Sequence, residues 1–379
     1  MNLSREKPAA DYETVRVDLP ARGYDILVGQ GLLAETGRHV GAVARGRRCA
    51  VVTNEVVAPL YLDAVRASLE DAGLTTEEIV LPQGEHTKDL RHLGDLADRL
   101  LEFRIDRACI LVALGGGVVG DIAGFAASIV LRGIDYVQIP TTLLAQVDSA
   151  VGGKTAVNTR HGKNLLGAFH QPRLVLADIA TLETLSTREF LAGYAEVVKY
   201  GLLGDADFFS WLEREGAALY EGDHAARRHA VVTCCAAKAA IVAGDEREAG
   251  RRQLLNLGHT FAHAFEAETA YGTTLLHGEA VAIGMVLAFE LSVRLGFCPS
   301  DDAERVRRHF AERGLRVGLE GLADASWTAD SLLEHMAHDK KALGGALTFV
   351  LARGIGEAFT SSAVEIGTVR TLLEDALRV

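Results

Sequence analysis

Histidine and charged residues with helical spacing mark the second half of the chain. His259 and His263 are four positions apart in NLGHTFAH, so both would lie on one face of a helix. His277 follows in HGE, and Glu196 and Lys199 stand within the apolar stretch GYAEVVKYGLL. A charge in an apolar helix is costly unless it is paired or binds a metal, and two imidazoles with a carboxylate can hold a catalytic zinc. The spacing alone selects His259 and His263 as ligands, with ordinary helix-surface histidines as the alternative.

A glycine-rich segment in the first half, Gly115–Gly120 (GGGVVG), matches the pattern G-x-G-x-x-G. It follows the apolar run CILVAL and leads into the helix-like IAGFAASIVL. Glycines there permit a tight turn and let backbone N–H groups approach a pyrophosphate at the start of a helix. The segment therefore favours a dinucleotide site, although a turn that merely packs a strand on a helix has the same pattern. The acidic residue expected about 20 positions further on is not cleanly placed, because Asp135 precedes the next strand.

A set of basic residues, several of them near glycine or asparagine, indicates capture of a small anion, with solvated faces as the alternative for any one of them. They are Lys154, Lys163, Lys199, Lys238, Arg252 and the pair Lys340-Lys341. The segment Gly152–Thr155 (GGKT) resembles the end of a phosphate-binding P-loop. Asp148 occupies the position where that motif needs its first glycine, so a full P-loop is not expected.

The elements that must position these residues change in character along the chain. Short apolar runs alternate with helix-like stretches in the first half, which predicts a mostly parallel sheet covered by helices. Strands are expected at 49–53, 78–81, 109–114, 136–139 and 174–177, helices at 56–72 and 89–103, and a hairpin where VRVDL and YDILVG flank PARG. Ser186 and Glu189 then fit a capping box that opens a run of helices to about residue 338, followed by a short strand at 347–352 and a last helix.

Length and composition set outer limits on the function. The 379 residues favour two domains, which we place at 1–185 and 186–379, and two-domain enzymes commonly bind substrate in the cleft between domains. A net charge of 39 minus 51, or −12, makes a broad nucleic-acid surface unexpected. The start has no apolar signal-like region, and the apolar run Ala280–Phe289 has half the length of a membrane span, so we expect no membrane partner. Five cysteines without a C-x-x-C pair are typical of reduced thiols in a cytosolic protein.

Longer motifs resemble the 3-dehydroquinate synthase family of the sugar-phosphate cyclase superfamily. They are LPQGEHTK, GGGVVGDIAGF, RGIDYVQIPTTLLAQVDSAVGGKTAVN, GKNLLGAFHQP, YAEVVKYGLL, DEREAGRRQLLNLGHTFAH, LLHGEAVAIGM and HDKKALGGALTFVL, in that order. The resemblance covers residues 14–375. It implies an α/β Rossmann-like N-terminal domain that binds NAD and an all-α C-terminal domain that binds metal and substrate. It also implies a divalent metal, zinc or cobalt, and a cytoplasmic homodimer.

The resemblance also implies roles for individual residues. The metal ligands become Glu196, His259 and His277, and His263 moves to the substrate side. The implied NAD residues are Glu85, Lys88, Gly116, Gly117, Asp121, Thr141, Thr142, Asp148, Lys154, Lys163 and Thr184. The implied substrate residues are Lys163, Lys238, Arg252, Asn256 and Lys340, with the choice between Lys340 and Lys341 open, and the implied catalytic residues are Lys154, Lys199, Asn164, His263 and Arg132. Arg132 would be lent to the neighbouring subunit. The spacing from His259 to His277 is slightly longer than the family pattern, and we expect the extra length to be harmless in the loop Tyr271–Leu276.

The activity implied is that of a carbon–oxygen lyase acting on a phosphate. The substrate would be 3-deoxy-D-arabino-heptulosonate 7-phosphate, and the products 3-dehydroquinate and phosphate, in the shikimate pathway of aromatic amino-acid biosynthesis. The implied sequence is transient oxidation by NAD, phosphate elimination, reduction and an intramolecular aldol closure. Two alternatives are a 2-epi-5-epi-valiolone synthase-like cyclase acting on sedoheptulose 7-phosphate and an NAD- and metal-dependent polyol dehydrogenase. Sedoheptulose 7-phosphate has no carboxylate, so a substrate with a carboxylate is favoured by the retention of Lys238, Arg252, Asn256, His263 and the pair Lys340-Lys341.

Overall fold

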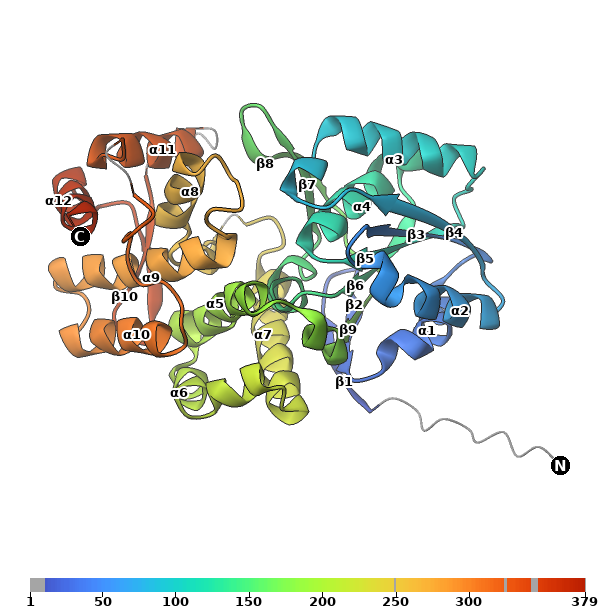
Figure 1. The fold of residues 1–379 in the computed structure, drawn as a ribbon, viewed down its shortest axis with the longest axis horizontal. Coiled ribbons are helices and arrows are strands. Elements are labelled where there is room, and N and C mark those ends of the chain that lie inside the picture. Colours follow the sequence, from blue (N-terminus) through green and yellow to red (C-terminus); the bar gives the residue numbers. More distant parts are fainter. Residues whose placement is uncertain (1–10, 249, 324–325, 342–346, 379) are drawn as a thin grey trace. The chain divides into compact units, whose positions relative to one another are not determined.

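The chain forms two compact units (Figure 1). The computed structural model describes residues 11–248, 250–323, 326–341 and 347–378, with the backbone alone for 338–341. One unit comprises residues 1–184 with 227–243, and the other comprises 185–226 with 244–379. Residues 227–243 therefore belong with the first unit. A single division of the chain after residue 185 would place this segment in the second unit.

The first unit is built on a seven-stranded sheet in the order β1-β2-β9-β6-β5-β3-β4. The strands are β1 (Tyr12–Val17), β2 (Tyr24–Gly29), β3 (Arg48–Asn54), β4 (Thr75–Leu81), β5 (Ile110–Gly115), β6 (Asp135–Pro140) and β9 (Leu174–Asp178). β1 pairs antiparallel with β2, which confirms the expected hairpin, and all other neighbours are parallel. The five apolar runs predicted as strands are confirmed as β3, β4, β5, β6 and β9.

Helices cover both faces of this sheet (Figure 1). They are α1 (Thr36–Val43), α2 (Asp63–Asp71), α3 (Leu90–Glu102) and α4 (Gly117–Ile129). Side chains alternate between faces along a strand, and β3 shows this directly: Val51 packs in the core that includes α1 and α2, and Val52 in the core under α3 and α4. The helix expected at 56–72 is a π-helical turn, Ala58–Leu62, followed by α2.

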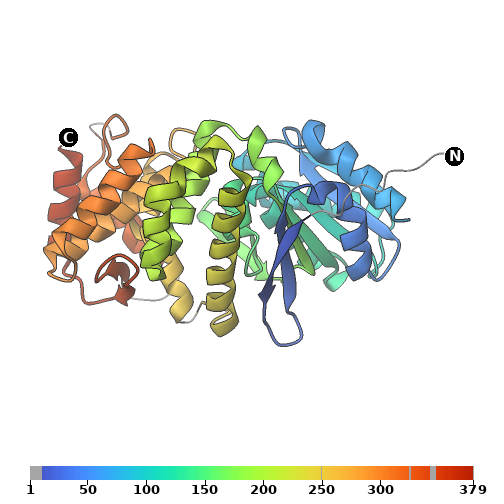
Figure 2. The same cartoon turned by 90° about the horizontal axis from the view of Figure 1, so that it is seen from below.

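Helix α7 (His224–Gly244) and a β-ribbon complete the first unit. In Figure 2, α7 lies beside the blue β1–β2 hairpin, where Arg228 Nη1 donates to Asp11 Oδ2 at 2.7 Å. Further along α7, Cys235 Sγ donates to the Gln146 carbonyl at 3.3 Å, which brings the helix onto the π-turn Ala145–Ser149. The ribbon pairs β7 (Lys154–Thr159) with β8 (Gly162–Phe169), two strands that the sequence did not predict.

The second unit consists mainly of helices, with one two-stranded ribbon. The helices are α5 (Thr187–Gly204), α6 (Ala206–Glu221), α8 (His259–Glu268), α9 (His277–Arg294), α10 (Ser300–Glu312), α11 (Ala329–Lys341) and α12 (Ile366–Leu377), and β10 (Phe349–Ala352) pairs with β11 (Ala358–Ser361). One half of the expected capping box is confirmed, since Ser186 Oγ accepts from Glu189 N at 3.3 Å. The run Ala280–Phe289 is buried within α9, as predicted. Within the described residues, every helix is too short or too polar to span a membrane.

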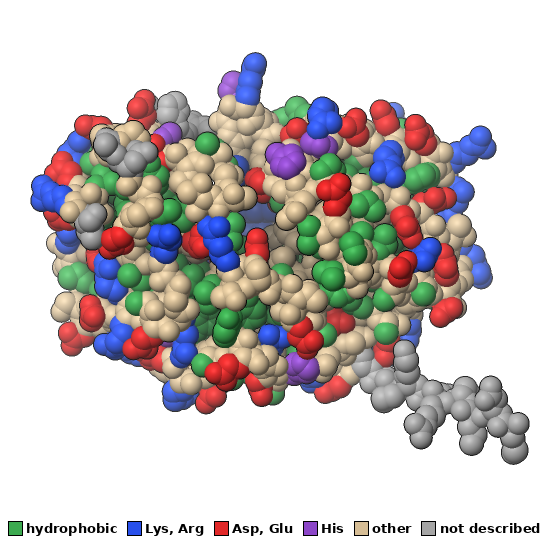
Figure 3. Space-filling view, in the orientation of Figure 1, with side chains coloured by type: hydrophobic (Ala, Val, Ile, Leu, Met, Phe, Trp, Pro, Cys, Tyr) green, Lys and Arg blue, Asp and Glu red, His purple; other side chains and the backbone are tan. Residues whose placement is uncertain are grey.

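Charged side chains of both signs are interspersed over the described surface visible in Figure 3. On this face, acidic side chains have basic ones between them. On this face, the described side chains form no broad basic area of the kind that attracts a nucleic-acid backbone.

A histidine in the core of the second unit should make this unit sensitive to acid. His309 is 3% exposed, and its Nε2 lies 2.9 Å from the Tyr194 hydroxyl. Burial and the nearby Arg313 guanidinium lower the pKa of His309 from 6.5 to about 4. The same imidazole in the unfolded chain takes up a proton near pH 6.5. Between these two values the unfolded state therefore binds more protons than the folded state, and stability falls as the pH falls.

We expect the contribution of His309 to the free energy of unfolding to be complete above pH 6.5 and to be lost as the pH approaches 4. The difference between the pKa values of the unfolded and folded states corresponds to roughly 3 kcal/mol in the free energy of unfolding. In His309→Gln, whose amide oxygen can accept from Tyr194, this part of the pH dependence should disappear. Denaturant unfolding at a series of pH values measures it, with the exposed His161→Gln as the control. If the free energy of unfolding of His309→Gln fell with pH as steeply as that of the wild type, His309 would not be the source of the acid sensitivity.

Candidate metal and dinucleotide sites

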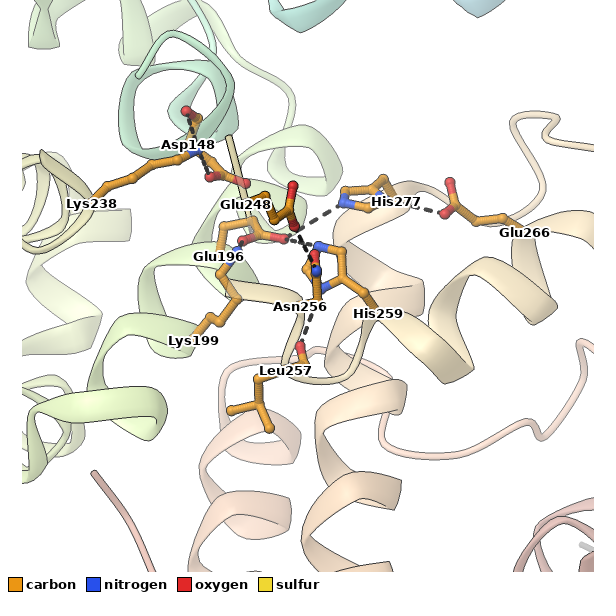
Figure 4. Close-up of polar contacts among 10 residues, drawn as sticks. All are labelled: Asp148, Glu196, Lys199, Lys238, Glu248, Asn256, Leu257, His259, Glu266 and His277. Carbon is orange, nitrogen blue, oxygen red and sulfur yellow. Dashed lines mark hydrogen bonds and ion pairs between the residues drawn. The ribbon is translucent and has the colours of Figure 1, made fainter. Parts of the chain in front are cut away.

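Three helices of the second unit bring Glu196, His259 and His277 together (Figure 4). Glu196 lies in the middle of α5, and the two histidines are the first residues of α8 and α9. Glu196 Oε1 lies 3.7 Å from His259 Nε2 and 3.6 Å from His277 Nε2. One ligand atom from each residue lies within 4.8 Å of the other two. Among the described residues, this is the group of histidine, cysteine and acidic side chains whose spacing fits a metal ion.

The two imidazole rings are oriented by hydrogen bonds at their other nitrogen. His259 Nδ1 donates to the Leu257 carbonyl at 3.2 Å, and His277 Nδ1 donates to Glu266 Oε2 at 3.2 Å. Each ring therefore presents Nε2 to Glu196. Histidine ligands in metalloproteins almost always have such a partner, which fixes the tautomer and the ring orientation. The donor set and its supporting contacts thus fit a divalent cation that prefers nitrogen and oxygen ligands.

Electrostatics at this cluster also favour a cation. Burial, together with the Lys199 ammonium, lowers the pKa of His259 to about 3, so its ring is neutral. Burial also lowers the pKa of His277, but the carboxylates of Glu266 and Glu196 outweigh burial and raise this pKa to about 10. Glu196 is fully buried and forms an ion pair with Lys199 through Oε2. Two buried carboxylates thus surround His277, and they would stabilise a positive charge at this point.

His263 lies beside this cluster, outside the group that fits a metal. Its ring centroid is 5.6 Å from that of His259 and 6.3 Å from that of His277. The i,i+4 pair selected by spacing alone is therefore not the ligand set that the geometry favours. Instead, the structure brings together the set that the family resemblance implied.

Two residues implied for the substrate lie just before His259. Arg252 and Asn256 belong to the 3₁₀ helix Arg251–Asn256. Arg252 is 1% exposed and donates from Nη1 to the Glu246 carbonyl at 2.5 Å, and Asn256 Nδ2 donates to Glu248 Oε1 at 2.9 Å. The side chain of Lys340 lies outside the described residues. Glu248 could not be singled out from the sequence, because it lies in a charged run that resembles an ordinary helix end.

The glycine-rich segment has the arrangement expected of a dinucleotide-binding turn. β5 ends at Gly115, Gly116 is the N-cap, and α4 begins at Gly117. A Cβ atom on Gly116 would lie 3.0 Å from Thr142 Cγ2, and one on Gly117 would lie 3.1 Å from Ser149 Oγ. The neighbouring Thr141 donates its N–H to the Gly115 carbonyl at 3.1 Å. The predicted order of strand, glycine turn and helix is confirmed, and both glycines stand where a side chain would crowd a neighbouring residue. A helix that starts directly after such a turn is of the kind that binds a pyrophosphate.

Other residues implied for NAD form two polar groups in the first unit. Lys88 is 5% exposed, and its Nζ lies 2.5 Å from both Asp121 Oδ2 and Asn164 Oδ1. Burial raises the pKa of the Asp121 carboxyl, and Lys88 opposes this shift. Asn164 lies in β8, and in the paired strand β7 Asn158 Nδ2 donates to Glu85 Oε1 at 2.7 Å. The contact between Lys88 and Asn164 joins a residue implied for NAD to one implied for catalysis.

The remaining candidates are distributed over the first unit. Lys238 donates to the Asp148 carbonyl at 2.7 Å and forms an ion pair with its carboxylate, as Figure 4 shows. The Thr184 hydroxyl lies 2.6 Å from the Tyr61 hydroxyl. On the β7–β8 ribbon, Lys154 is exposed and Lys163 is half-buried. The exposed Arg132 has a φ of +66°, an uncommon conformation for a non-glycine residue.

Glu266 and Arg188 were missed by the sequence analysis. Glu266 is 2% exposed. The signal available in the sequence was an acidic residue in the mainly apolar stretch FAHAFEAE, three residues after His263. Arg188 donates to Glu279 at the start of α9, a contact across two helices that the sequence does not reveal.

The first unit is a mostly parallel sheet that is covered on both faces and carries a glycine-rich turn. The helical unit holds a buried carboxylate and two histidines. These features together are those of a dinucleotide- and metal-dependent enzyme. The model of the 3-dehydroquinate synthase N-terminal domain matches residues 78–192, and that of the C-terminal domain matches 193–342. The chain belongs to the 3-dehydroquinate synthase family.

Individual proteins agree with this assignment. A 3-dehydroquinate synthase of Rhodospirillum rubrum is 56% identical over 371 residues, which are 98% of this chain and 96% of the relative. Among solved structures, a 2-epi-5-epi-valiolone synthase of Streptomyces hygroscopicus with bound NAD+ and Zn2+ is 30% identical with a TM-score of 0.86, covering 95% of this chain and 98% of the other. A 2-deoxy-scyllo-inosose synthase with carbaglucose-6-phosphate, NAD+ and Co2+ is 25% identical with a TM-score of 0.83. The match covers 96% of this chain and 100% of the other.

Proposed function

We propose that the chain converts 3-deoxy-D-arabino-heptulosonate 7-phosphate to 3-dehydroquinate and phosphate, as a carbon–oxygen lyase of the shikimate pathway. The observation that carries the proposal is the cluster of Glu196, His259 and His277, within a sequence that matches a named 3-dehydroquinate synthase at 56% identity over nearly its whole length. The valiolone synthase is much less similar, at 30%. We further propose that the enzyme acts in the cytoplasm as a homodimer, with Arg132 lent to the neighbouring subunit.

The cofactors we propose are NAD and a divalent metal, zinc or cobalt. Two solved relatives contain NAD+ together with Zn2+ or Co2+. When bound, NAD would supply a reversible hydride acceptor and the metal a Lewis acid for the substrate hydroxyls. Glu196, His259 and His277 would hold the metal. NAD would be held chiefly by the residues implied above in the first unit, and the metal by residues of the second unit.

The chain's own residues would bind a substrate that is anionic at both ends. We assign Lys154, Asn164, His263 and Arg132 to the phosphate, and Lys238, Arg252 and Lys340 to the carboxylate. Asn256 is a further substrate residue. Lys199 forms an ion pair with Glu196, so its ammonium lies beside the ligand carboxylate and can donate to a hydroxyl of the bound substrate. Holding both anionic ends fixes one conformer, and such orientation with preorganised charge can supply much of a rate acceleration.

An assay with catalytic NAD tests the reaction. We expect phosphate release from the heptulosonate phosphate to continue far beyond one turnover per NAD, without net accumulation of NADH, because the hydride is returned in each cycle. Phosphate release and absorbance at the NADH band should be followed together, with sedoheptulose 7-phosphate as the control substrate. Turnover of the control substrate alone would favour the valiolone-type cyclase. Stoichiometric NADH with a polyol would favour the dehydrogenase.

A further inference from the structure

His277 differs from the other two proposed ligands in what precedes it. Glu196 stands within the continuous helix α5, and His259 follows a single turn at Gly258. His277 follows the irregular segment 269–276, in which Ala270 and Tyr271 have φ values of +52° and +56°. This segment includes the stretch where the chain is expected to be longer than its family pattern. The place of His277 therefore depends on contacts that hold this segment and the start of α9.

Arg188 supplies four such contacts from the first turn of α5. Its Nε and Nη2 donate to the two carboxylate oxygens of Glu279 at 2.7 Å each. Its Nη1 donates to the Thr273 carbonyl and its Nη2 to the Thr274 carbonyl, both at 2.9 Å. Glu279 in turn accepts the N–H of Leu276 at 2.8 Å. A forked guanidinium–carboxylate pair with two further carbonyl acceptors is far more restrictive than a simple surface ion pair.

These contacts connect the backbone around His277 to the helix that carries Glu196. Arg188 and Glu196 are both in α5, and Thr273, Thr274 and Glu279 flank His277 on both sides. Arg188 therefore fixes the start of α9 relative to the ligand carboxylate.

Glu266 holds the ring of His277 from the third helix. It lies in α8, the helix that begins with His259, and is 2% exposed. Its Oε2 accepts from His277 Nδ1 at 3.2 Å, as the dashed line in Figure 4 shows. The ring is thus oriented from α8, and its backbone is held from α5.

We propose that Arg188 and Glu266 are positioning residues that set metal affinity through His277, with Arg188 fixing the backbone and Glu266 fixing the ring. The proposal rests on the metal site of the proposed function. Loss of an outer partner of a metal ligand typically costs about 10- to 100-fold in metal affinity. We expect a loss of this size in Glu266→Ala, a smaller loss in Glu266→Gln, whose amide oxygen still accepts from Nδ1, and a loss of about 10-fold in Arg188→Ala.

The test is the dissociation constant for Zn2+, measured on the full chain by competition with a chromophoric chelator. The matched control is Arg294→Ala, because Arg294 also lies in the second unit and forms an ion pair of 2.8 Å with Asp375, but away from the cluster. Arg188→Lys is informative as well. It keeps the charge but loses the fork, so it should resemble Arg188→Ala and not the wild type.

A spectroscopic readout separates positioning from a general loss of stability. In the Co2+-substituted protein, we expect the visible absorption bands of Glu266→Ala to shift and those of Arg294→Ala to match the wild type, because the ring of His277 reorients only in the first. Zn2+ affinities of Glu266→Ala and Arg188→Ala within threefold of the wild type would overturn the inference. Because Arg188 is about half exposed, its variant should fold even where Glu266→Ala does not. A wild-type chain without measurable Zn2+ binding would instead refute the metal site itself.

Discussion

His277→Ala is expected to abolish metal retention, whereas His263→Ala should keep the metal and slow phosphate elimination. His277 Nε2 lies 3.6 Å from Glu196 Oε1 within the group that fits a cation, and His263 lies outside this group. A Lewis-acid metal contributes several kcal/mol of transition-state stabilisation, which is on the order of a thousandfold or more in rate. His277→Ala should therefore fall to background activity, and excess metal should restore little of it.

The measurement is metal content per chain after gel filtration, together with the rate of phosphate release. His335→Ala is a suitable control, because His335 is another histidine of the second unit, paired with Glu268 at 3.7 Å instead of with the cluster. Metal lost from His263→Ala but retained by His277→Ala would restore the i,i+4 pair as the ligands and remove His277 from the site.

The dinucleotide turn could be predicted because its signal is local. A buried strand, a glycine turn and a helix follow one another without interruption from β5 to α4, so the pattern and the structure involve the same consecutive residues. The metal cluster is different. Spacing compares residues on one helix and therefore selects His259 with His263, but Glu196, His259 and His277 come from three helices. Only the resemblance to a family could supply that set before the structure, because tertiary packing creates it.

Three elements of the first unit, the strands β7 and β8 and the helix α7, show a further limit of local patterns. The strands β7 and β8 carry lysine, asparagine and glycine (KTAVNT and GKNLLGAF), which weakens the alternation that identifies a strand. Helix α7 is rich in alanine and easily recognised as a helix, but its sequence does not reveal that residues 227–243 pack with the first unit. A helix is predicted from the periodicity of its own residues. The unit against which it packs depends also on the surface of that unit, which the helix sequence does not contain.

The close packing around α9 depends on glycines that the sequence pattern does not distinguish from others. A Cβ atom on Gly284 would lie 2.1 Å from the Gly258 carbonyl oxygen, and one on Gly278 would lie 1.8 Å from the Ala192 carbonyl oxygen. Gly258 itself has a φ of +81° and directly precedes His259. The helix that begins with His277 therefore contacts the turn before His259 and helix α5 through backbone atoms.

Gly284→Ala should consequently destabilise the second unit and weaken metal binding together. Alanine gains up to about 1 kcal/mol from helix propensity. A carbon–oxygen contact normally needs about 3.3 Å, so backbone must move by more than 1 Å to admit the methyl group. Such overpacking costs roughly 1–3 kcal/mol or more, and the required shift separates His259 from His277. The net loss in the free energy of unfolding should be roughly 1–2 kcal/mol, with a reduced affinity for Zn2+.

Denaturant unfolding and chelator competition measure the two effects on the same sample. Gly367→Ala is the matched control, because Gly367 lies in α12 of the same unit, and a Cβ there would meet no other atom within 4 Å. Helix propensity alone predicts that this control is neutral or more stable by up to about 1 kcal/mol. If Gly284→Ala were as stable as Gly367→Ala and kept wild-type metal affinity, α9 could move without disturbing the histidines. The backbone contact at Gly258 would then not be what sets the distance between the two rings.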